Sequence, residues 1–272
     1  MNKFFATKSA AAAMAAAITG MATLAGSVAF AASPAWADST TTTSTTTAPP
    51  AATTTVALPE KAEDRLAWVK KDSDRLVARR VAALNKVLAD VNKLNYLGSD
   101  QAALVNEIQG GINGLQALDA KIQGDTTLKV ALADRAQIFS GYRVYLLMLP
   151  VVARVTMTDW YVNFKVPAVN SQIAQIQAQE NSSNQIVLGP LVSGMQSQVS
   201  IITTATNGLS AQLLAFTPAQ WDANHKLLAT SAADLRTAAR ATSVAERDYA
   251  QAERYLKTGH LSGTNHKGGR HR

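Results

Sequence analysis

Apolar residues recur at alternating intervals of three and four along most of the chain after Leu58, the spacing of one buried face on an α-helix. The first such row predicts a helix over about 60–94. The row shifts by one position near Leu76, as expected when a long helix drifts against a strict seven-residue repeat. Its two sets are Leu66, Val69, Ser73 and Leu76, followed by Val77, Val81, Leu84, Leu88 and Val91.

A second helix is predicted after 98–100, where Gly, Ser and Asp form a stop and a cap. Gly110, Gly111 and Gly114 each destabilise this helix by about 1 kcal/mol relative to alanine. We therefore expect them to allow the close approach of a neighbouring helix. A short helical segment, 127–138, follows. The buried row of the second helix is Leu104, Ile108, Gly111, Leu115, Leu118 and Ile122.

The stretch from Val144 to Ala153 is ten uncharged, apolar residues. It is far shorter than the ~20 residues needed to cross a membrane, so it is predicted to be buried in the fold. Pro150 suits the first turn of a following helix, and Pro167 is expected to bend that helix. The row of this helix is Val155, Asp159, Val162, Val166, Val169, Ile173 and Ile176.

One further helix is predicted after a polar loop at 181–185. Its row continues without a slip through Leu188, Val192, Met195, Val199, Ile202, Thr206, Leu209, Leu213 and Phe216. The next helix start is explicit, with Thr217 as N-cap, Pro218 at the first position and Gln220 completing a capping box. Phe216 and Trp221 form a candidate hydrophobic staple there. From this point a last helix is predicted to run to Leu256, roughly 55 to 60 Å.

These rows predict an all-α fold, namely an elongated antiparallel helical bundle with coiled-coil-like heptad seams over 59–257. Long rods joined by short loops fit an extended bundle better than a sphere. Only 6% of the residues are aromatic, and the 47% hydrophobic share leans on alanine, which favours thin, closely packed helices.

The start of the chain has the features of a secretory signal peptide, predicted over 1–37. Lys3 and Lys8 precede an uncharged, Ala-rich stretch, and Ala35-Trp36-Ala37 matches an A-x-A cleavage site. The alternative is an uncleaved anchor, because the uncharged stretch is long enough to span a bilayer. Residues 38–58, rich in Ser, Thr and Pro, are predicted to be a disordered stalk that acts as a spacer or carries O-linked sugars.

The positive charge of the chain is concentrated at its ends. Of the formal +7, two charges belong to Lys3 and Lys8 and four to the last sixteen residues, which leaves +1 for 38–256. A basic nucleic-acid-binding face is therefore not expected. The tail, 258–272 with the adjoining Lys257, is predicted to be disordered and to bind anionic surfaces electrostatically. Its candidate binding residues are Lys257, Lys267, Arg270 and Arg272.

The chain lacks the common signatures of catalysis. It has no cysteine, no H-E-x-x-H, no G-x-S-x-G and no Walker A motif. His225 is the only histidine in the predicted bundle, where a single histidine is most often a packing residue. The three tail histidines form no preorganised metal site. An enzyme is therefore not predicted, and no cofactor or metal is expected.

Asp159 lies on the predicted buried face of its helix, between Val155 and Val162. An unpaired carboxylate buried there would destabilise the fold by several kcal/mol. Two explanations are open. One is a buried ion pair with Arg143 or Arg154 that fixes the register. The other is a small polar pocket that binds a ligand or peptide. The candidate residues for the pair or the pocket are Tyr142, Arg143, Tyr145, Arg154, Asp159, Trp160 and Tyr161.

Two motifs resemble those of a known group of proteins. The run Tyr142-Arg143-Val144-Tyr145 leads to Pro150, and Phe216-Thr217-Pro218-Ala219 opens a last Ala-rich helix. Over roughly 60–257 the chain is similar to uncharacterised exported all-helical proteins of actinobacteria. The resemblance implies an exported helical fold and brings no activity or site residues.

The sequence therefore predicts a non-catalytic exported structural or interaction protein of the cell envelope or extracellular space. Its helical rod would act as a spacer, a scaffold or a partner-binding module. The expected partner is an envelope protein or an anionic wall polymer, without nucleic acid and without a transmembrane segment in the mature chain; self-association through the helices stays open. The alternative is a small-ligand or metal-binding carrier that uses a polar pocket near Tyr145 and Asp159 or the His-containing tail.

Overall fold

The computed structural model describes residues 61–260, and the predicted signal peptide, the stalk and most of the tail lie outside that range. Every regular element of the described residues is a helix, so the all-α prediction is confirmed. The α-helices are α2 (Ala62–Val91), α3 (Asp100–Gly124), α4 (Leu128–Ser140), α5 (Leu149–Trp160), α6 (Val166–Gln177), α7 (Gln185–Thr206), α8 (Leu209–Leu214), α9 (Pro218–Ala223) and α10 (Ala229–Thr258). Two short π-helical turns, η1 (Val144–Met148) and η2 (Tyr161–Lys165), flank α5.

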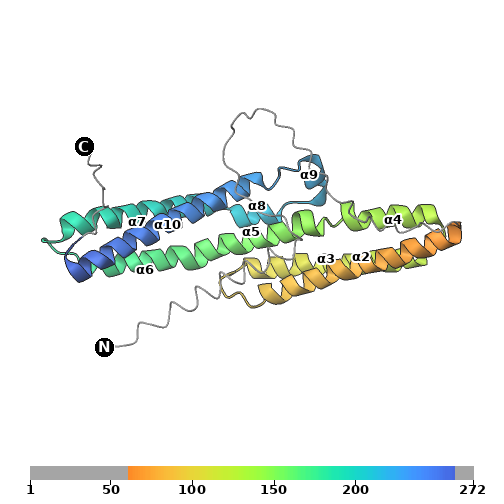
Figure 1. Cartoon of the computed structure of the whole chain (residues 1–272), viewed down its shortest axis with the longest axis horizontal. Helices are drawn as coiled ribbons and strands as arrows, with labels where there is room; N and C mark the ends of the chain where they lie inside the picture. Colours follow the sequence, from red (N-terminus) through yellow and green to blue (C-terminus); the bar gives the residue numbers. More distant parts are fainter. Residues whose placement is uncertain (1–60, 261–272) are drawn as a thin grey trace, which may run out of the picture.

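The helices form two groups at opposite ends of the long axis in Figure 1. Helices α2, α3 and α4 pack together in one group, and α6, α7 and α10 pack together in the other. The elements from α4 to α6 follow one another with one interruption, the turn at 141–143, and we call this stretch, Leu128–Gln177, the shared helix. It belongs to both groups, while α8 packs against α5 in the middle.

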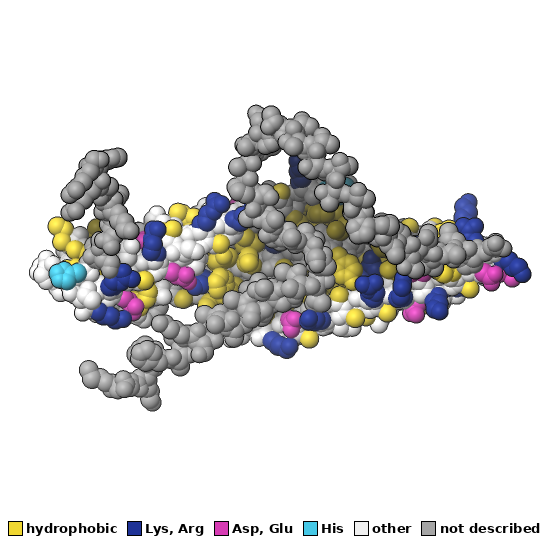
Figure 2. Space-filling view, in the orientation of Figure 1, with side chains coloured by type: hydrophobic (Ala, Val, Ile, Leu, Met, Phe, Trp, Pro, Cys, Tyr) yellow, Lys and Arg dark blue, Asp and Glu magenta, His cyan; other side chains and the backbone are white. Residues whose placement is uncertain are grey.

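Each group has its own hydrophobic core. The larger core is built around side chains such as Leu84, Leu104 and Val155, and the smaller one around Val169, Leu188 and Met195. Full burial of a side chain of this size contributes about 1.5–3 kcal/mol. On the face shown in Figure 2, hydrophobic side chains gather towards the middle, whereas charges of both signs are spread over the ends.

The shared helix and the stretch Gln185–Leu214 are long and apolar enough to cross a membrane by length and composition alone. Buried helices of a protein core meet the same criterion. In this structure only 39% of the apolar window of the shared helix and 22% of that of Gln185–Leu214 is buried, and the buried side chains of α6 and α7 line the smaller core.

The buried row of α2 differs in detail from its prediction. The buried residues are Val69, Ser73, Val77, Arg80, Leu84, Val87 and Val91. Two successive intervals of four, from Val69 to Ser73 to Val77, give the predicted one-position shift near Leu76, whereas Arg80 and Val87 are buried in place of the predicted Val81 and Leu88. Leu76, Val81 and Leu88 flank this row and are half-buried. The difference arises because an arginine, Arg80, occupies a buried position that a search for apolar residues passes over.

A proline lies two residues after the end of each π-helical turn. Pro150 and Pro167 lie in the first turns of α5 and α6. A proline inside a continuous α-helix has no N–H to donate and clashes with the carbonyl four residues earlier. The wider π turn spaces the hydrogen bonds five residues apart, as in the bond from Val166 N–H to the Tyr161 carbonyl. The structure thus has a π turn just before Pro167, the residue at which the sequence predicted a bend.

The extra residue in η2 also changes which side chains are buried. Tyr161 is buried in the core, whereas Val162, a predicted row position, is 43% exposed. A π turn adds about one residue to the helical turn, so the row moves by one position there. Beyond the turn, Val169, Ile173 and Ile176 are buried as predicted.

Two predicted long helices are each divided. The first ends at Thr206, and Gly208, with a φ of 66°, separates α7 from α8. The second is interrupted after α9, so α10 has 30 residues and a length of about 45 Å. The capping box at Thr217 and Gln220 is present as predicted, but it begins only the short α9. His225 lies exposed in the turn before α10, with its ring 5.8 Å from that of Trp221.

Candidate functional site

The predicted polar residues do not surround one cavity. They lie along the turn before η1, η1 itself, α5 and η2, as Tyr142, Arg143, Tyr145, Arg154, Asp159, Trp160 and Tyr161. Tyr145 turns towards α2, where its hydroxyl donates to the Arg79 carbonyl at 3.4 Å. Trp160 packs its ring near Phe164, and its indole nitrogen is buried without an acceptor among the described residues.

Neither candidate arginine is the partner of Asp159. Arg143 forms an ion pair with Asp222 of α9 at 2.6 Å. Arg154 donates to the Pro150 carbonyl at 3.1 Å, and burial together with the nearby Arg236 lowers its pKa. The predicted Arg–Asp pair is therefore wrong, because both guanidinium groups are turned towards other oxygen atoms.

Asp159 is instead bonded to a serine from α8. Only 4% of the residue is exposed, and its Oδ1 accepts a hydrogen bond of 2.8 Å from the Ser210 hydroxyl. Burial raises the pKa of Asp159 to about 7; the Ser210 hydrogen bond opposes this change, and the Asp100 carboxyl group adds to it. Oδ2 is buried without a hydrogen-bond partner among the described residues, which favours the neutral, protonated form of the carboxyl group.

The surroundings of Asp159 connect four elements. Tyr96 is buried nearby, and burial and the charge of Asp159 raise the pKa of its phenol. The Tyr96 carbonyl accepts a hydrogen bond of 2.8 Å from Asn163 of η2. This cluster joins the α2–α3 connection, α5, α8 and η2 through polar contacts, so its evident role is to fix how these elements meet.

A second polar feature, which the sequence analysis missed, lies between α2 and α4. The Arg80 guanidinium lies 4.7 Å from the centre of the Phe139 ring and 5.3 Å from that of Tyr145. The Arg135 guanidinium makes a similar contact, 5.8 Å from the centre of the Trp68 ring, and forms an ion pair with Asp72. Burial lowers the pKa of Arg80, and such cation–π contacts contribute about 0.5–2 kcal/mol each.

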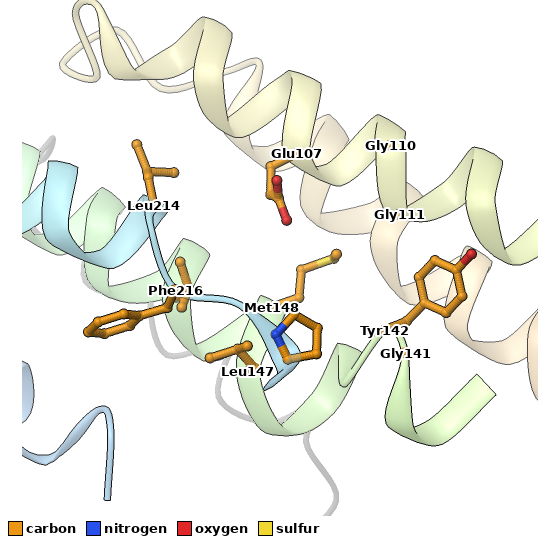
Figure 3. Close-up of a pocket in the computed structure, with 11 residues that line it drawn as sticks. Glu107, Gly110, Gly111, Gly141, Tyr142, Leu147, Met148, Leu214 and Phe216 are labelled. Atoms are coloured by element: carbon orange, nitrogen blue, oxygen red, sulfur yellow. The ribbon is translucent and has the colours of Figure 1, made fainter. Parts of the chain in front are cut away.

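A cavity of about 240 Å³ lies at the junction of α3, η1 and the connection between α8 and α9 (Figure 3). Of the predicted pocket residues only Tyr142 lines it. Figure 3 shows Glu107 of α3 and Met148 of η1 pointing towards each other across the space. The lining residues are Glu107, Gly110, Gly111, Gly141, Tyr142, Leu147, Met148, Val151, Leu214, Phe216 and Pro218.

Glycines of α3 provide room for side chains of the opposite wall. A Cβ on Gly111 would lie 2.7 Å from Cε of Met148, and one on Gly114 would lie 2.6 Å from the Tyr142 hydroxyl oxygen. A Cβ on Gly110 would meet no atom within 4 Å. Gly111 and Gly114 thus make room for the side chains of Met148 and Tyr142, which is a close approach of side chains and not the predicted close approach of a helix. Glu107 lies on the same face of α3, three and four residues before Gly110 and Gly111. This spacing can be seen in the sequence, but by itself it does not indicate a cavity.

The backbone beside the cavity is strained. Arg143 is the one non-glycine residue with positive φ in the described range, at 41°. Such a conformation destabilises the fold by about 1–3 kcal/mol and persists only where surrounding contacts hold it. The ion pair with Asp222 supplies such a contact, because it ties the turn before η1 to α9.

The predicted tail is described only in part. Lys257 lies in the last turn of α10, with its ammonium group 3.7 Å from Glu253. Lys267, Arg270 and Arg272 lie outside the described residues. Within 61–260 no cluster of three or more His, Asp or Glu side chains is placed to hold a metal ion.

Comparison of the chain with protein-family models, curated proteins and solved structures finds no match. The chemistry of the candidate sites therefore rests on their geometry. The Asp159 cluster has one buried acid bonded to a hydroxyl group, and the cavity has one carboxylate at the edge of an apolar wall. The first arrangement stabilises a junction of helices, and the second offers a surface to a small molecule.

Proposed function

We propose that this chain is a non-catalytic exported structural or interaction protein of the cell envelope or extracellular space. Its helical body acts as a spacer, scaffold or partner-binding module. The observation that carries this proposal is the shared helix, Leu128–Gln177, which takes part in both helical groups. Bending it in the middle would separate side chains from both cores, so it resists bending.

The participation of the shared helix in both groups also supports a more detailed proposal about the shape of the helical body. We take the body to be an elongated antiparallel bundle whose helices meet along heptad seams. The rows on α3 and α10 favour this arrangement, since their buried residues recur at intervals close to three and four. The part of the shared helix without an interruption, 144–177, has 34 residues and extends over about 50 Å at 1.5 Å per residue.

Export and attachment rest on the ends of the sequence. The Ala35-Trp36-Ala37 site with its preceding basic and apolar stretches supports secretion, and the Ser/Thr/Pro-rich segment supports a spacer. The basic residues near the C-terminus favour contact with an anionic wall polymer. The alternative of a small-ligand carrier draws its support from the cavity beside Glu107 rather than from Tyr145 and Asp159.

A spacer must keep its length, and this property is measurable. The chain has no cysteine, so Thr126→Cys and Ser182→Cys give two exposed labelling sites near opposite ends of the shared helix. Single-molecule energy transfer between dyes at these sites should give one narrow distribution at a long distance. A labelled pair on α10 alone, Thr230→Cys with Lys257→Cys, calibrates the width for one rigid helix. A broad or double distribution for the first pair would overturn the spacer proposal.

A further inference from the structure

The cavity beside Glu107 combines three kinds of surface on three separate elements. Helix α3 supplies the carboxylate of Glu107 and two glycines, Gly110 and Gly111. The η1 turn supplies Met148, and the connection after α8 supplies Phe216. A concave apolar wall with a few placed polar groups is the usual form of a small-molecule site.

The Glu107 carboxylate is available to a ligand. It takes part in none of the ion pairs found among residues 61–260. Arg143 is the cation closest in sequence to the cavity wall, and it is engaged by Asp222. Among residues 61–260, the cavity therefore presents one exposed negative charge without an ion pair beside its apolar wall.

The size of the space limits the ligand. An engineered cavity of about 150 Å³ holds benzene. A cavity of about 240 Å³ therefore admits one ring with a short substituent, or an alkyl chain of similar volume. A nucleotide or a folded peptide segment is too large to be enclosed.

The charge of the site selects among small molecules. Glu107 is exposed, so its carboxylate is hydrated in the absence of a ligand. An anion would be repelled by it, and a neutral apolar molecule would gain no charge-assisted contact there. A primary or secondary ammonium group would make a charge-assisted hydrogen bond with Glu107, and the rings of Tyr142 and Phe216 line the same space. Aromatic rings also attract cations through their faces.

From these observations we propose that the cavity is a binding site for a small amine that carries one ring or a short alkyl chain. The ammonium group lies at Glu107, and the apolar part lies among Leu147, Met148 and Phe216. The strained turn at Arg143, held by Asp222, keeps the wall in place before the ligand arrives. This role goes beyond the proposed spacer, which does not require a ligand.

The proposal can be tested with 2-phenylethylamine as the probe and 2-phenylethanol and phenylacetate as neutral and anionic analogues. Titration into the ¹⁵N-labelled full chain, followed by NMR, should shift the amide signals of Gly110, Gly111 and Gly141. The amine should bind at least about tenfold more tightly than the alcohol, since a hydrogen bond to a charged group is the stronger kind. Phenylacetate should not bind. Equal shifts with all three probes, or shifts confined to other regions, would overturn the proposal.

Two variants test the placement of the ligand. Glu107→Gln should weaken binding of the amine by about tenfold and leave the weak binding of the alcohol unchanged. Gly110→Leu should abolish binding of both, because its side chain enters space that no atom occupies within 4 Å of the Cβ. Gly124→Leu on the same helix is the matched control, since its Cβ also meets nothing within 4 Å and it does not line the cavity.

Folding of the variants is checked by thermal unfolding. Leucine is a better helix former than glycine, so Gly110→Leu is expected to retain or raise the melting temperature. If that variant unfolds, the Glu107→Gln titration and the comparison of the probes still decide the result. Full binding of the amine by a folded Gly110→Leu or Glu107→Gln variant would exclude this site.

Discussion

Replacement of Asp159 by asparagine should stabilise the protein at pH 8 far more than at pH 5. Asparagine has nearly the same shape, and its oxygen can accept the hydrogen bond from Ser210. Unlike aspartate, it carries no charge that must be desolvated. The substitution therefore removes the titration of one buried group and keeps its contacts.

The magnitude follows from the two pKa values of Asp159. In the folded protein the pKa is about 7, whereas an unperturbed carboxyl group has a value of 3.8. Between these values the folded state holds a proton that the unfolded state has released, so stability falls as pH rises through this window and levels off above it. At about 1.4 kcal/mol per unit, the full loss is about 4 kcal/mol. About 3 kcal/mol of this loss falls between pH 5 and pH 8.

The assay is urea unfolding of both proteins, followed by far-ultraviolet circular dichroism at pH 5 and pH 8. The free energy of unfolding of Asp159→Asn, relative to the wild type, should rise by about 3 kcal/mol between the two pH values. Comparison with the wild type at each pH cancels the titration of other groups. Asp74→Asn, an exposed carboxylate in α2, is the control and should show no such rise. If the difference in the free energy of unfolding between Asp159→Asn and the wild type is the same at pH 5 and pH 8, the argument that Asp159 is buried in its protonated form is refuted.

Three further predictions concern other parts of the chain. Thr217→Ala should lower the free energy of unfolding by about 1 kcal/mol through loss of the N-cap, and chemical denaturation that shows no loss would contradict the role of the capping box. Arg143→Gly should be more stable than Arg143→Ala by about 1 kcal/mol in the same assay, since both lose the ion pair but only glycine relieves the positive φ; the opposite order would show that the strain is absent. Replacement of Lys267, Arg270 and Arg272 by serine should remove most binding to isolated envelope fractions in cosedimentation at low salt, and wild-type binding should weaken as the Debye length falls to about 8 Å at 0.15 M. Binding that is unchanged in this triple variant would locate the contact on the helical body.

The elements whose structure depends on local sequence could be predicted well. The glycine, serine and aspartate at 98–100 mark the start of α3, and Thr217 with Gln220 forms the expected capping box. On α10 the buried residues Ser231, Leu235, Ala238, Thr242 and Ala245 recur at intervals of four and three, as the spacing of a helix requires. The spacing of apolar residues determines which face of a helix is buried, and capping residues determine where the helix begins. Both are visible in a short stretch of sequence.

The features that depend on distant or competing contacts could not be predicted. Gly208 interrupts a helix without disturbing the spacing of the row, because Thr206 and Leu209 are still three apart. The partner of Asp159 is Ser210, 51 residues away, and neither neighbouring arginine. Periodicity shows that a carboxyl group lies on a buried face but does not show which distant hydroxyl group will meet it. The cavity at Glu107 was missed for the same reason, since its opposite wall comes from η1 and the α8–α9 connection.

The course of two helices through both cores has a thermodynamic consequence. Val155 of the shared helix lies in the larger core and Ile173 in the smaller one, and α10 similarly contributes Leu235 to one and Ala245 to the other. Neither core can open without removing support from a helix that the other needs. The two groups are therefore expected to melt in one cooperative transition, and a molecule held beside Glu107 would raise the stability of the far end of the protein as well as its own surroundings.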